Sequence, residues 1–193
     1  MRAEYENVLD DHLGKIHFTY VNTWDELLPA HWHEHLEIIY VLGGEITASI
    51  NDVSYELEKG DIFLVNSNDI HYTYTHEDAR YYLLQIPPVH LERISAKWKG
   101  LKFQELIRSK SADACVQGEQ LENVQGKGLV EMRENRKSTN RADDLYDQLR
   151  DVFRKIAGFY EEKKEGYHLL VLSAVYRLLY FLYTEGIRSE EDT

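Results

Sequence analysis

Apolar and polar positions alternate in short runs between residues 16 and 86, and a period of two residues is typical of β-strands. Ile16, Phe18 and Tyr20 share one face of an extended chain, with polar residues between them. Six further runs follow, at residues 36–42, 45–50, 53–57, 61–65, 70–75 and 80–86. Strands this short and this regularly spaced predict a β-sandwich or a small barrel.

The segments around these runs are predicted to be irregular or helical. Residues 24–29 indicate a loop, and Pro87-Pro88 ends the β region because proline cannot donate to a sheet ladder. Residues 89–107 mix apolar and basic positions at helical spacing, which predicts one or two short helices. Residues 109–141 show no sustained period and predict an irregular connection.

Two helical patterns close the chain. Between residues 142 and 163, apolar positions recur at steps of three and four, which predicts an amphipathic helix. Leu169 to Tyr183 is apolar nearly all round, but it is shorter than the about 20 residues of a membrane span and contains Arg177. Such a helix must be covered on every side, by the core of its own chain or by a second copy. The candidate dimer contacts are Tyr176, Leu179, Tyr180 and Tyr183.

Composition narrows the class of protein. With 193 residues the chain has the length of one ordinary domain. Its net charge of -12 argues against a nucleic-acid-binding surface on this segment, because phosphate contact needs clustered Lys and Arg. A single cysteine, Cys115, excludes an intramolecular disulfide and favours a reducing compartment, and the acidic N-terminus does not resemble a secretory signal. We therefore expect a cytoplasmic protein.

The candidate chemistry is concentrated between His31 and His71. In one extended strand His31, His33, His35 and Glu37 would project to the same side. His71 follows a turn and would approach from across the interior of a rolled sheet. Imidazole and carboxylate groups at this spacing suit zinc, iron, nickel or manganese, or a hydrogen-bonded organic ligand.

The spacing His-x-His-x-x-x-Glu, followed by Gly-x5-Asn-x-Asn-x-x-His, resembles the two cupin motifs. Their four ligand positions fall on His31, His33, Glu37 and His71. The second motif departs from the cupin pattern, with Asn66 in place of proline, Asn68 in place of glycine and Thr75 in place of asparagine. These departures weaken the prediction of a metal-dependent enzyme more than the prediction of the fold.

The amino-acid sequence of residues 31–42, 55–66 and 70–71 resembles that of the N-terminal sensor domain of AraC-family transcription regulators. The resemblance extends over roughly residues 15–90. It implies a mainly β fold, a cupin-like barrel (double-stranded β-helix) followed by an antiparallel helix pair. The implied parts are an N-terminal arm at 1–14, a sensor barrel at 15–88, short helices and an irregular connection at 89–141, and a dimerising helix pair at 142–185. We expect no DNA-binding helix-turn-helix domain within these residues, since only ten residues follow Tyr183, so the chain is expected to be the sensor domain of a longer regulator or, as the alternative, a free-standing cupin.

Three interpretations of the histidine cluster remain open. In the one we favour, His31, His33, Glu37 and His71 bind a small molecule such as a sugar, with Tyr20, Tyr72 and Tyr82 among its aromatic walls and without a metal cofactor. The chain would then be no enzyme but a homodimeric sensor with no membrane partner, reaching DNA only through another domain. In the second interpretation the same four residues hold a divalent transition metal in a cupin enzyme, of the dioxygenase or sugar isomerase type. In the third they are structural.

Overall fold

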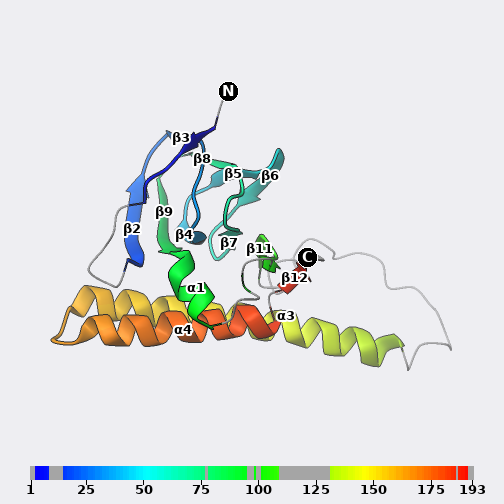
Figure 1. Ribbon diagram of the computed structural model, residues 1–193. Helices are drawn as coiled ribbons and strands as arrows, with labels where there is room; N and C mark the ends of the chain where they lie inside the picture. The colour runs from blue at the N-terminus through cyan, green and yellow to red at the C-terminus, as the bar shows by residue number, and fades with distance from the viewer. Residues whose placement is uncertain are drawn as a thin grey trace.

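The computed structural model describes residues 3–8, 15–76, 78–94, 98, 101–108, 131–185 and 187–190, with the backbone alone at 131–143 and 187–190. Within these residues two five-stranded sheets form a barrel, which lies on a layer of two long helices (Figure 1). One sheet has the order β1-β3-β8-β5-β6 and the other β11-β7-β4-β9-β2, and a small third sheet pairs β10 with β12.

The strands are β1 (Glu4–Tyr5), β2 (His17–Thr23), β3 (Glu26–Trp32), β4 (Leu36–Gly43), β5 (Ile46–Ile50), β6 (Val53–Leu57), β7 (Ile62–Val65), β8 (His71–Thr75), β9 (Ala79–Ile86), β10 (Leu101–Phe103), β11 (Leu106–Ile107) and β12 (Ile187–Glu190). The helices are α1 (Pro88–Ile94), α3 (Glu131–Glu162) and α4 (Tyr167–Glu185). The order of strands and helices agrees with the predicted class, a mainly β chain with C-terminal helices. No helix among the described residues combines the length and apolarity that crossing a membrane requires.

The sheet that contains β4 is buried on both faces. Alternate residues such as Ile39 and Val41 point into the barrel, while Ile38 and Tyr40 point toward the helices. On that outer face Tyr40 packs against Phe153 of α3, with ring centroids 5.6 Å apart. The barrel and the helix pair therefore share one hydrophobic core. This core fixes the position of the sheet that carries Glu37.

Two predicted irregular segments have regular structure. The expected loop at 24–29 is wrong from Glu26 onward, because β3 pairs there with β8. Pro29 lies inside this strand where the register shifts between Leu28 and His31, so its missing N–H falls at an interruption of the ladder. Of the connection predicted at 109–141, residues 131–141 are helical and belong to α3, whereas 109–130, including Cys115, lie outside the described residues.

The region after Pro87-Pro88 begins as predicted, with the short helix α1. The helical expectation for residues 101–107 is wrong, because β11 adds to the edge of a sheet, where Leu106 pairs with Phe63. Tertiary pairing has overridden the local pattern here. The helix predicted at 169–183 lies within α4, and a connection of four residues that ends at Gly166, with φ of 78°, makes α3 and α4 antiparallel neighbours.

Candidate functional site

The four residues predicted to converge do so at the end of the barrel where the two sheets meet. His31 is on β3, His71 begins β8, and Glu37 is on β4 of the opposite sheet. His33 lies in the segment that carries the chain from one sheet to the other. The prediction of a single strand from 31 to 37 is wrong, because the chain bends at residues 34–35. The bend takes His35 out of the cluster, with its ring edge-on to that of His33 at 5.9 Å.

The three histidines of the cluster are buried and close together. Their nearest ring nitrogens all lie within 4.8 Å of one another. His31 and His71 are cross-strand partners with ring centroids 4.1 Å apart, and the ring of His33 lies 4.9 Å from that of His71. Strand pairing therefore sets the position of one histidine pair, and the crossing between sheets adds the third.

Backbone carbonyls orient all three rings. Nδ1 of His31 lies 2.8 Å from the oxygen of Pro29, Nδ1 of His33 lies 3.2 Å from that of His35, and Nδ1 of His71 lies 3.0 Å from that of Asp69. A carbonyl oxygen only accepts, so each Nδ1 carries a hydrogen and each Nε2 faces the site. Buried Nε2 atoms of His31 and His71 have no hydrogen-bond partner in the described part of the chain. Buried nitrogens without a hydrogen-bond partner indicate a site for a bound ion, water or ligand.

Glu37 supplies the negative charge of the cluster. Its Oε2 accepts hydrogen bonds from Nε2 of Gln85 at 2.8 Å and Nε2 of His33 at 3.1 Å, and its Oε1 lies 3.8 Å from Nε2 of His71. Burial acts to raise the pKa of Glu37, but the hydrogen bond from His33 and the nearby imidazoles outweigh it and lower this pKa to about 2. The carboxylate is therefore ionised at neutral pH.

The same charges separate the titration of two histidines. Burial acts to lower the pKa of His33, yet the hydrogen bond and charge of Glu37 outweigh burial and raise it. For His71 burial prevails over the attraction of Glu37, so its pKa is lowered. His33 thus favours the cationic form, which pairs with Glu37. His71 favours the neutral form, in which Nε2 carries a free electron pair.

A cavity of about 300 Å³ adjoins the cluster inside the barrel. Glu37, Thr73, Tyr81 and Gln85 contribute polar groups to its wall. Burial, reinforced by the charge of Glu37, raises the pKa of Tyr81 to about 12, so its hydroxyl keeps its hydrogen. Gln85 and Tyr81 were not among the predicted site residues. They could not be recognised from the sequence, because apolar residues occupy both faces of β9 and do not show which face lines the cavity.

Glu6 also joins the cluster, and sequence reasoning did not single it out. Its Oε2 lies 3.7 Å from Nε2 of His31 and 3.8 Å from Nε2 of His33. It follows β1, the strand formed by the described part of the predicted arm, which pairs in parallel with β3. No periodicity marks residues 1–14, so only the fold reveals this contact.

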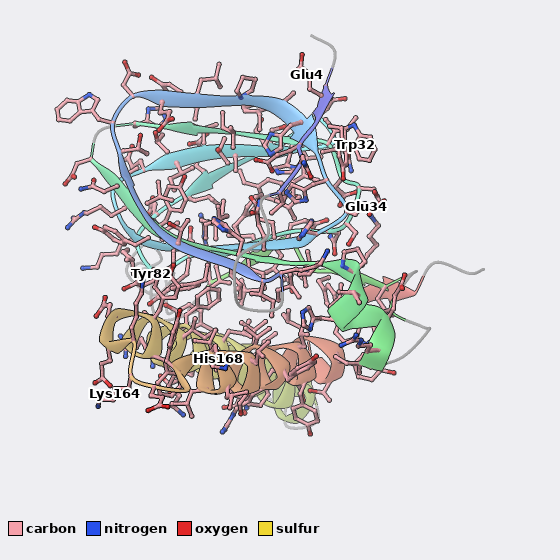
Figure 2. The ribbon with its side chains drawn as sticks, turned by 60° about the vertical axis from the view of Figure 1, so that its left-hand side comes forward. Glu4, Trp32, Glu34, Tyr82, Lys164 and His168 are labelled. Carbon is pink, nitrogen blue, oxygen red and sulfur yellow. The ribbon has the colours of Figure 1, made fainter. Side chains whose placement is uncertain are left out.

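The predicted aromatic walls lie on other surfaces. Tyr82 stacks on Phe18 at 5.4 Å and meets Tyr20 edge-on at 5.8 Å, on the face of the sheet toward the helices (Figure 2). Tyr72 alternates along β8 with buried His71 and Thr73, so it points out of the barrel. None of the three tyrosines is brought to the histidine cluster, because each has the opposite parity along its strand.

The predicted dimer contacts differ in exposure. Tyr180 is 62% exposed, and Tyr176 and Tyr183 keep more than a third of their surface exposed. Leu179 is wholly buried in the core of its own chain, so the expectation that it contacts a second copy is wrong. Leu179 and Tyr180 are therefore neighbours in the sequence but lie on different faces of α4, one buried and one exposed.

The family model described as AraC-like ligand binding domain matches residues 14–179. No curated protein matches the chain significantly. Similar solved structures include an RmlC-like cupin from Shewanella frigidimarina (20% identity, TM-score 0.36, 37% of this chain and 66% of that one). Others are KdgF from Halomonas sp. (23%, 0.35, 37% and 68%) and a predicted oxalate decarboxylase from Thermotoga maritima (22%, 0.34, 36% and 64%). The chain spans about two thirds of each, and at these identities they say nothing about its activity.

Proposed function

The chain belongs to the family of AraC-like ligand-binding domains, with a cupin-type barrel, and we propose that it senses a sugar or another polyol bound inside this barrel. The observation that carries the proposal is the cavity of about 300 Å³ onto which Glu37, Gln85 and Tyr81 converge. Ligand hydroxyls both donate and accept, so one polyol suits the carboxylate, the amide and the phenol together. We propose that ligand binding in a dimer alters how DNA-binding domains are presented to DNA.

A thermal-denaturation screen tests this function. Monosaccharides, sugar alcohols and sugar acids are titrated against the chain in the presence of a chelator, and a true ligand raises the Tm saturably. Glu37→Gln is expected to abolish the shift, because the amide lacks the negative charge and replaces one acceptor oxygen by an NH2 group that only donates. Glu58→Gln, an exposed carboxylate on the loop after β6, is the matched control and should respond as the wild type does. Equal responses of the two variants would remove the barrel cavity as the binding site.

A second function, metal binding, is favoured by the three converging imidazoles. His31, His33 and His71 each offer a ring nitrogen within 4.8 Å of the other two, and Glu37 offers a carboxylate. Their Nδ1–H groups donate to backbone carbonyls, the arrangement that typically orients metal-bound histidine. The donor set therefore fits a divalent transition metal, which would supply Lewis-acid or redox chemistry as in a cupin enzyme. Gln85 and Tyr81 would orient a substrate in the adjoining cavity.

Elemental analysis of the purified chain tests this second function. Zinc, iron, manganese or nickel near one equivalent would support it, provided that His33→Ala loses the metal. His168→Ala is the control, because His168 is exposed on α4, away from the cluster (Figure 2). A chain that binds no divalent metal after incubation and gel filtration would leave the polyol sensor as the remaining proposal.

A further inference from the structure

Glu6 reaches the cluster from a strand with little else to hold it. β1 comprises two residues whose side chains are both exposed. Its anchors are the parallel pairing with β3, a hydrogen bond from the Glu6 N–H to the oxygen of Trp32 at 3.0 Å, and an edge contact between Tyr5 and Trp32. The side chain of Glu6 is 38% exposed, but its Oε2 atom is buried and has no hydrogen-bond partner among the described residues. A buried carboxylate oxygen without a partner needs a bound cation or a hydrogen-bond donor.

The position of Glu6 suits a metal ligand. A first-row divalent ion holds nitrogen and oxygen ligands at about 2.0–2.2 Å, so neighbouring ligand atoms lie about 3.0–3.5 Å apart. Oε2 of Glu37 is 3.1 Å from Nε2 of His33, and Oε2 of Glu6 is 3.7 Å from Nε2 of His31 and 3.8 Å from Nε2 of His33. Glu6 therefore lies within a few tenths of an ångström of the spacing of an adjacent ligand.

Charge supports the same role. A divalent ion held by three neutral imidazoles and the Glu37 carboxylate would leave one uncompensated positive charge in a buried site. A second carboxylate neutralises it. Among the described residues, Glu6 and Glu37 are the carboxylates that approach these histidines within 4 Å.

We propose that Glu6 is a further ligand of a metal ion held by His31, His33, His71 and Glu37, and that this bond fastens β1 over the barrel cavity. The inference rests on the metal-binding function proposed above. Glu6 and the two residues after it, Asn7 and Val8, line the cavity with Glu37, Tyr81 and Gln85. The metal thus controls access to the cavity, and a molecule that enters by this side has to displace the arm. Figure 1 shows β1 on the side of the barrel away from α3 and α4.

The test compares the wild type with Glu6→Gln and with Glu4→Gln, a control that removes the same charge from an exposed residue of the same strand. Co²⁺ and Zn²⁺ are titrated alone, with the affinity from chelator competition and the ligand set from the visible spectrum of the Co²⁺ form. Hydrogen exchange at the amide of Glu6, which bonds to Trp32, reports on the arm with and without metal.

We expect Glu6→Gln to weaken metal binding about tenfold or more, to change the Co²⁺ spectrum, and to remove the metal-dependent slowing of exchange at residue 6. Glu4→Gln should match the wild type in all three. Wild-type affinity, spectrum and exchange in Glu6→Gln would overturn the role of Glu6 while leaving the metal site intact. Absence of Co²⁺ or Zn²⁺ binding by the wild type would overturn both the metal site and this inference.

Discussion

Oε2 of Glu37 lies 3.1 Å from Nε2 of His33, and both side chains are almost completely buried, at 5% and 1% exposed. The folded state keeps the pKa of Glu37 near 2, whereas an unfolded chain has it near 4.5. Between these values the unfolded state binds more protons, so stability rises with pH there. The pair joins β4 to the segment that connects the two sheets, and protonation of Glu37 in acid removes its charge.

The first prediction concerns acid stability. The free energy of unfolding should fall as pH drops from 4.5 toward 2, by about 3 kcal/mol for Glu37 alone. Glu37→Gln has no carboxyl to titrate, so its loss over this range should be smaller by that amount. Urea denaturation at several pH values measures the difference. Identical pH slopes in the two proteins would show that Glu37 is not held as a buried anion.

A second prediction concerns Asn66, which stands where the cupin pattern usually has proline. The Asn66 side chain is buried, donates from Nδ2 to the oxygen of Phe103 at 3.2 Å and accepts from the N–H of Phe103 at 2.8 Å. Asn66→Ala should cost about 2 kcal/mol, because both backbone groups of Phe103 lose a buried partner. Asn22→Ala, at an exposed residue of β2, should stay within about 0.5 kcal/mol of the wild type. Urea denaturation distinguishes the two variants. A similar small effect at both positions would contradict the stabilising role of the two hydrogen bonds between Asn66 and Phe103.

Much of this fold was predictable because its strands obey a simple parity. The six runs from 36 to 86 match β4 to β9 closely, since connections with Gly, Asn or Asp bound them and one face of each packs inside the barrel. Strand β3 escaped prediction because Pro29 lies inside it, at a register shift that only the pairing with β8 reveals. The early start of α3 escaped because residues 131–141 are polar and show no apolar period.

The site was predictable only in part, for a related reason. His31, His33, Glu37 and His71 were identifiable from spacing, and the structure brings them together, while their role in binding stays a prediction. Strand β9 is covered on both faces, so the adjacent residues Tyr81 and Tyr82 cannot be assigned to inside and outside from their pattern. Their assignment depends on the register with β4, which places Tyr82 opposite Tyr40.

A third prediction follows from the core that the barrel and helices share. Phe153 on α3 is fully buried and packs on Tyr40 of β4. Phe153→Ala should destabilise the whole chain by about 3–5 kcal/mol, because a large cavity opens between the two layers. Phe159→Ala, at a half-buried position of the same helix, should cost less. Loss of helical signal alone, with the barrel melting as in the wild type, would show that the two parts fold separately.

The last prediction concerns self-association through α4. Leu169, Tyr176, Tyr180 and Tyr183 are exposed and recur at steps of seven, four and three, which places them along one stripe of the helix. An apolar stripe of this kind on a helix is typical of helix–helix association, so we expect the chain to dimerise at micromolar concentration. Tyr180→Glu should shift the protein to monomer, because a carboxylate would be buried without a partner. Val53→Glu, at a residue of β6 that is 54% exposed, should remain dimeric. Sedimentation velocity measures all three, and a Tyr180→Glu dimer as tight as the wild type would place the interface elsewhere.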